Sequence, residues 1–120
     1  MPVMAHAREV VEIAAVAAKL ASGGYDSFSA EERRYAASKS DETRRLAARW
    51  AAKLAAARAL GGGVRPEDVE VVRDHGAPYL RLAAAAEARR VALGSPRLLV
   101  SLTHGVTHAA ASVVLEQAGP

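Results

Sequence analysis

The stretch from Arg49 to Gly61, RWAAKLAAARALG, decides the fold class of this 120-residue chain. Alanine, the strongest helix former, fills six of its thirteen positions, and a run of three glycines follows Leu60 and ends the helix. The helix is predicted over 41–60, with Asp41 as its N-cap. Two neighbouring stripes share the four-residue spacing of one helix face: an apolar one (Leu46, Trp50, Leu54) and a basic one (Arg45, Arg49, Lys53).

The residues on either side of this helix predict a single α+β domain over 1–120. Ser29 and Glu32 have the spacing of a capping box and begin a short helix. Valine-rich alternation in the second half predicts strands, and His75-Gly76-Ala77-Pro78 is typical of a turn. The expected order is strand 2–9, helices 10–21, 29–37 and 41–60, strands 68–73 and 79–82, helix 83–93, and strands 98–103 and 107–115. We therefore expect an antiparallel sheet packed on one long and several short helices.

Composition excludes several classes of function. The chain has no cysteine, which excludes disulfides and thiolate metal sites. A net charge of +3 and an aromatic content of 4% are too low for a nucleic-acid-binding protein. No apolar run has the length of a membrane span, and the first residues lack the pattern of a signal peptide. We therefore expect a cytoplasmic protein that binds neither nucleic acid nor membrane.

Three further patterns accompany the long helix in a fixed order. They are Glu9–Ile13 near the start, Asp68–Arg73 followed by Gly76–Pro78, and Val100–His104 followed by Ala109–Glu116. Together with Arg49–Gly61, these segments resemble the holo-acyl-carrier-protein synthases, the small class of 4′-phosphopantetheinyl transferases. The resemblance extends over nearly the whole chain, and the ordered set of motifs is more specific than any one of them.

This resemblance implies the phosphopantetheinyl transferase fold and a homotrimer with its sites at subunit interfaces. It implies Mg²⁺ and coenzyme A as cofactors, and a reaction in a fatty-acid or polyketide pathway that transfers phosphopantetheine to a serine of an acyl carrier protein. It places Glu9 at a metal-ligand position and Arg58 where it would stabilise transfer. The residues that it implies for coenzyme A binding are Arg49, Lys53, Ser101, Thr103 and His104.

The sequence departs from the family pattern where the metal should bind. Leu54 stands in place of a second metal-binding glutamate, and a leucine cannot coordinate Mg²⁺. Glu9 replaces an aspartate, so its carboxylate lies one methylene further from the backbone. Arg58 replaces a lysine four residues after Leu54, and these two positions share one helix face. From these departures we expect a degraded Mg²⁺ site.

Histidines supply the other candidate chemistry. His6, His104 and His108, together with Glu9, could form an acid–base or metal constellation, and Arg58 is a further catalytic candidate. Three functions stay open at this point. The chain could be a repurposed enzyme for acid–base or cyclisation chemistry on an acyl chain, a non-catalytic homologue, or an active phosphopantetheinyl transferase; the sequence favours the first two.

Overall fold

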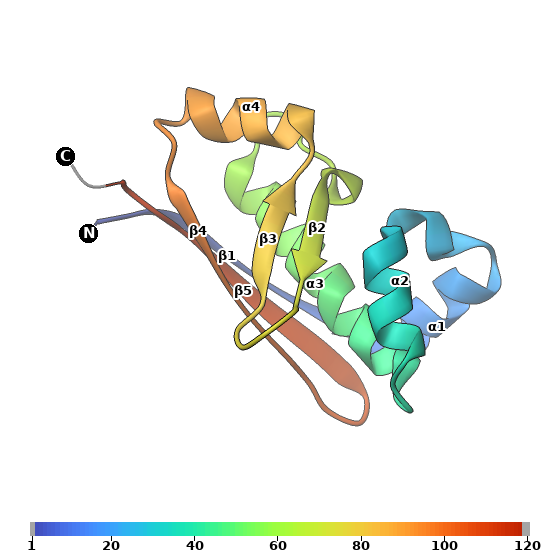
Figure 1. Cartoon of the computed structure of the whole chain (residues 1–120). Coiled ribbons are helices and arrows are strands. Elements are labelled where there is room, and N and C mark those ends of the chain that lie inside the picture. The colour runs from blue at the N-terminus through green and yellow to red at the C-terminus, as the bar shows by residue number, and fades with distance from the viewer. Residues whose placement is uncertain (1, 119–120) are drawn as a thin grey trace.

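The structure, a computed structural model, describes residues 2–118 and has the expected α+β architecture (Figure 1). Its strands are β1 (Val3–Glu12), β2 (Val69–Val72), β3 (Tyr79–Leu82), β4 (Arg97–His104) and β5 (His108–Glu116). Its helices are α1 (Ile13–Ala21), α2 (Ala30–Ala37), α3 (Glu42–Leu60) and α4 (Ala84–Ala92), with short 3₁₀ turns at Gly24–Ser27 and Pro66–Asp68. None of the described helices is both long and apolar enough to cross a lipid bilayer.

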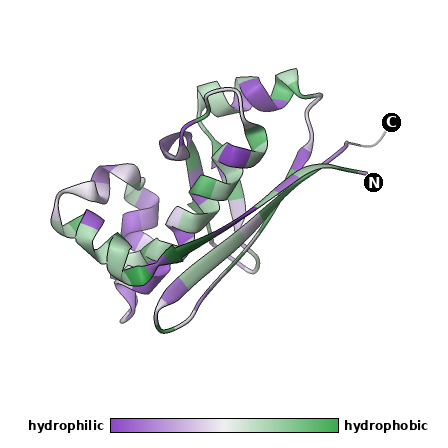
Figure 2. Cartoon of the chain, turned by 180° about the vertical axis from the view of Figure 1, so that it is seen from behind, coloured by the Kyte–Doolittle hydropathy of each residue, from purple (hydrophilic) through white to green (hydrophobic). Residues whose placement is uncertain are grey.

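An antiparallel sheet in the order β1-β5-β4 forms one side of the molecule, and β2 and β3 form a separate hairpin. The central strand, β5, is hydrophobic along most of its length (Figure 2). β1 ends three residues later than predicted, because Val10 and Glu12 pair with Ala110 and His108 instead of beginning a helix. Two β-branched valines favour the extended backbone there, and the sheet pairing outweighs the helical spacing of the apolar residues.

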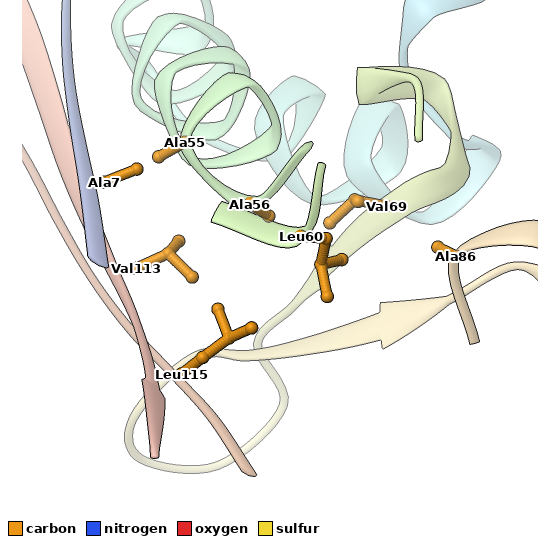
Figure 3. Packing of buried hydrophobic residues seen from close by; sticks show 8 residues of the cluster. All are labelled: Ala7, Ala55, Ala56, Leu60, Val69, Ala86, Val113 and Leu115. Atoms are coloured by element: carbon orange, nitrogen blue, oxygen red, sulfur yellow. The ribbon is translucent and has the colours of Figure 1, made fainter. Parts of the chain in front are cut away.

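Helix α3 runs between this sheet and the hairpin (Figure 1). Ala51 and Ala52 pack in one cluster with Val71 of β2 and Ala111 of β5. A second cluster joins residues of α3 to both sides as well, as Figure 3 shows for Ala7, Ala55, Ala56, Leu60, Val69, Ala86, Val113 and Leu115. A helix covered on two sides needs small side chains on both faces, which explains its alanine content.

The basic stripe of α3 is not a solvated face. Lys53 is only 1% exposed, and its ammonium donates to Glu32 Oε1 at 2.7 Å and to the carbonyl of Val69 at 2.6 Å. The Glu32 carboxylate also accepts from the backbone N–H groups of Ser29 and Val71 at 2.8 and 2.7 Å. This buried ion pair therefore fixes α2, α3 and β2 to one another.

The two predicted helix caps have different outcomes. The capping box is confirmed, because Ser29 Oγ accepts from the N–H of Glu32 while Glu32 accepts from the N–H of Ser29. Asp41 is the N-cap residue of α3, as predicted, but its side chain makes no capping hydrogen bond. Its carboxylate instead accepts from Arg45 Nε at 2.7 Å, because a guanidinium one turn away offers a charged donor.

Replacing Glu32 by glutamine should destabilise the protein strongly, because it leaves the buried Lys53 ammonium without a countercharge. We expect the free energy of unfolding to fall by about 3–5 kcal/mol. Urea unfolding at one protein concentration measures the change. The matched control is Glu31→Gln on the same helix, which removes an exposed ion pair to Arg34 and should lower stability by less than about 1 kcal/mol. Equal losses for the two variants would contradict the structural role of the buried pair.

Candidate functional site

A cationic hollow opens between the first half of α3 and the end of β4. We call it the arginine hollow; its volume is about 200 Å³, and its lining residues are Arg45, Ala48, Arg49, Arg73, Leu102, Thr103 and His104. A neighbouring hollow of about 310 Å³ shares Arg49 and Arg73 with it and is also lined by Tyr35, Arg81 and the carboxylates of Glu31 and Asp74. Cationic side chains from α3, the β2–β3 hairpin and β4 thus converge on one place.

Arg49 is the most constrained member of this group. It is only 3% exposed, and its guanidinium stacks 4.2 Å from the ring centre of Tyr35. Its Nε is the one buried side-chain nitrogen or oxygen among the described residues that lacks a hydrogen-bond partner. Burial is the largest influence on the pKa of Arg49 and lowers it, while Tyr35 and Glu32 oppose this effect. An anionic ligand would satisfy the free donor and repay part of the desolvation.

Asp41 orients two other residues of the arginine hollow. One carboxylate oxygen accepts from Arg45 Nε, and the other lies 3.7 Å from His104 Nε2. The Arg45 hydrogen bond is the main cause that lowers the pKa of Asp41, and the same bond raises the pKa of Arg45. Arg45 also donates to the hydroxyl of Tyr35 at 3.3 Å. This carboxylate therefore fixes the position of one permanent positive charge and lies close to one imidazole.

A second cationic hollow, of about 370 Å³, lies beside β1, which is an edge strand of its sheet. We call it the edge hollow, and its lining residues are His6, Ala7, Arg8 and Arg58. Glu9 of β1 accepts a hydrogen bond from Arg58 Nη1 at 2.8 Å, which joins the strand to the last turns of α3. The Arg58 side chain is 71% exposed and that of Glu9 is 25% exposed.

A divalent cation does not fit the residues of this edge. Mg²⁺ prefers oxygen ligands, and Glu9 offers one carboxylate that the Arg58 guanidinium already occupies. Leu54, one helical turn before Arg58, has no ligand atom. Among residues 2–118, no group of three or more carboxylate or imidazole side chains lies close enough together to hold a metal ion. The residues present therefore do not supply the Mg²⁺ site that the family pattern implies.

The structure brings together only some of the predicted site residues. Arg49, Thr103 and His104 line the arginine hollow, and His6 and Arg58 line the edge hollow. Lys53 does not reach either hollow, because its ammonium is buried against Glu32; its predicted contact with coenzyme A is replaced by a structural role. Ser101 is exposed on β4 and is not among the residues that line the arginine hollow.

The histidines do not converge within one chain. His6 pairs with Val114, whereas His108 pairs with Glu12 at the other end of β1. Six residue steps of extended strand separate His6 from Glu12, the partner of His108, and this corresponds to about 20 Å along β1. His108 Nδ1 lies 2.8 Å from Thr107 Oγ1 in an exposed position. The predicted acid–base constellation of His6, His104 and His108 is therefore not formed by a single subunit.

Sequence reasoning missed four residues of these two places. Tyr35, Asp41 and Arg73 belong to the arginine hollow or to its neighbourhood, and Arg8 belongs to the edge hollow. The spacing of Asp41, Arg45 and Arg49, four residues apart on one helix, was a usable signal for an oriented cationic face. Arg73 carried no such signal, because the fold of the hairpin alone places it opposite α3.

Comparison with known proteins gives close relatives. A holo-acyl-carrier-protein synthase of Anaeromyxobacter sp. (strain K) is 47% identical over 97 residues, which cover 78% of this chain and 74% of that protein. The synthase of Nitratidesulfovibrio vulgaris is 54% identical over 76 residues. That match covers 59% of this chain and spans 61% of the length of the relative. No protein-family model matches the sequence.

Solved structures agree with these relatives. The ACPS–CoA complex of Chronobacterium ammoniagenes superposes with a TM-score of 0.80 at 29% identity. The alignment covers 96% of this chain and 98% of that one, so the whole described fold has its counterpart there. Sequence identity to the curated relatives and agreement of the fold lead to the same conclusion. This chain belongs to the holo-acyl-carrier-protein synthase family.

Proposed function

We propose that this protein is a 4′-phosphopantetheinyl transferase, which moves the phosphopantetheine arm of coenzyme A to a serine of an acyl carrier protein. The observation that carries the proposal is the arginine hollow, where Arg45, Arg49, Arg73 and His104 meet. Membership of the family supports it, as does the solved relative that is a complex with coenzyme A. No observation favours the repurposed or non-catalytic functions that the sequence left open.

The chemistry needs a site that holds several phosphate groups. The serine oxygen of the carrier protein forms a bond to the phosphorus next to the pantetheine, and the bond from that phosphorus to the bridging oxygen breaks. The leaving group is 3′,5′-ADP, and the serine proton is released. Because little covalent chemistry is left to the protein, catalysis consists mainly of positioning the phosphates and stabilising their charge.

The side chains of the arginine hollow suit the task of positioning phosphate groups. Arg49 offers a buried donor without a partner, and a guanidinium binds phosphate oxygens through two parallel N–H groups. Arg45 is held in one orientation by Asp41, so little of its conformational entropy is lost on binding. Thr103 and His104 add a hydroxyl and an imidazole at the end of β4. We assign this hollow to the phosphates of coenzyme A.

The two hollows also support a site between subunits. Arg49 and Arg58 are nine residues apart on α3, which corresponds to about two and a half turns and 14 Å along the axis. They therefore leave α3 on opposite sides, and the helix between them is buried. A single ligand that uses an arginine hollow and an edge hollow would take them from neighbouring subunits. This geometry supports sites between subunits, in line with the homotrimer that the resemblance implies.

Incubation of the protein with an apo acyl carrier protein, coenzyme A and Mg²⁺ should add one phosphopantetheine mass to the carrier. Intact-protein mass spectrometry measures the addition. A carrier protein whose acceptor serine is replaced by alanine is the control and should stay unchanged. Absence of any mass gain with several carrier proteins, under conditions where a standard transferase modifies them, would overturn the proposed function.

Replacing Arg73 by glutamine should weaken coenzyme A binding about tenfold or more, because a charge-assisted hydrogen bond to phosphate is lost. Arg73 is exposed, so the fold should tolerate the change. Isothermal titration calorimetry measures the dissociation constant. The matched control is Arg33→Gln on α2, which removes the same charge from an exposed position outside both hollows. If both variants bind like the unaltered protein, the phosphates are bound elsewhere.

A further inference from the structure

The ion pair between Glu9 and Arg58 occupies the place where the family pattern implies a metal. Glu9 Oε2 and Arg58 Nη1 are 2.8 Å apart, and this is the one hydrogen bond that the Arg58 side chain makes to the described residues. A guanidinium has five N–H donors, so most of those of Arg58 stay available to a ligand. The pair thus combines a neutralised carboxylate with an exposed, oriented set of donors.

We propose that the Arg58 guanidinium, held by Glu9, is the resident cation of the edge hollow, so that this chain binds the diphosphate of coenzyme A without a divalent cation. This inference rests on the proposed function. Arg58 differs from a metal ion in that it is covalently part of the chain and is always charged. Binding should therefore depend on the guanidinium and be indifferent to chelators.

Leu54 stands where the family pattern has a glutamate, and its apolar side chain leaves the ion pair between Glu9 and Arg58 undisturbed. It lies four residues before Arg58 on the same face of α3, where a carboxylate would compete for the guanidinium. A second carboxylate beside Glu9 would also cancel the net positive charge of the edge hollow, and a diphosphate would then need a metal ion between itself and the protein. With leucine at this position, Glu9 and Arg58 balance each other and no such ion is needed.

Arg8 supplies further positive charge at the same place. It lines the edge hollow together with His6 and Arg58, and no hydrogen bond joins Arg8 to another described side chain. With Glu9, Arg8 and Arg58 counted and His6 neutral, the edge hollow carries one net positive charge. A planar guanidinium pairs with phosphate oxygens through two parallel hydrogen bonds, so the hollow suits a diphosphate.

Calorimetric titration of the full-length protein with coenzyme A tests this inference. One titration is performed in EDTA and the other in excess Mg²⁺. We expect the two dissociation constants to agree within about twofold, because no metal takes part. Arg58→Gln should weaken binding about tenfold or more in EDTA, since a charge-assisted interaction is lost. Arg97→Gln, which removes an exposed partner of Glu116 on the sheet, should leave the affinity unchanged.

A double variant creates the opposite arrangement. Leu54→Glu combined with Arg58→Gln places two carboxylates side by side and removes the guanidinium. Its coenzyme A binding should be weaker in EDTA than in Mg²⁺, in contrast to the unaltered protein. Both changes lie at exposed or half-buried positions, and circular dichroism verifies that the variant is folded.

The outcomes separate this inference from the function on which it rests. Binding of coenzyme A that disappears in EDTA and returns with Mg²⁺ would overturn the inference and leave the transferase function standing. Unchanged affinity of Arg58→Gln in EDTA would overturn it as well. Absence of coenzyme A binding in both buffers would overturn the proposed function and the inference together.

Discussion

The buried ion pair between Lys53 and Glu32 is the interaction on which the arrangement of this protein depends. Taking both charges out of water costs several kcal/mol. The structure offsets this cost by giving the carboxylate two backbone N–H donors besides the ammonium, and the ammonium a carbonyl besides the carboxylate. Because the partners come from α2, α3 and β2, only one relative placement of these elements satisfies all of the polar groups.

This placement sets the functional surface. Arg49 lies one turn before Lys53 on α3, and the docking of α2 brings Tyr35 against its guanidinium. The attachment of β2 in turn brings Arg73 of the hairpin to the same hollow. A cluster of like charges would repel if it were left alone; here one carboxylate, one aromatic ring and the bound anion of the proposed function compensate for it.

Positive charge at the edge of β1 is supplied in a different way from that in the arginine hollow. A protein that binds a diphosphate must supply positive charge, either as a bound metal ion or as a fixed side chain. Glu9 and Arg58 form an ion pair with each other. Leu54 offers no oxygen atom, so the second ligand that a metal ion would need is absent from this position. Under the inference drawn above, this ion pair would supply the positive charge for the diphosphate in place of a metal ion.

The sequence by itself determined the order of the elements, the long alanine-rich helix and the capping box at Ser29, because these depend on spacing within one segment. It also singled out Arg49, His104 and Arg58 through the resemblance of its motifs to the family, and the structure places these residues at the two hollows. Only the tertiary structure decided that Lys53 is buried, that Asp41 orients Arg45 and His104, and that Arg73 faces α3. Each of these depends on contacts between segments distant in the chain, where pairing and burial outweigh local propensity, as they also do where Val10–Glu12 extend β1.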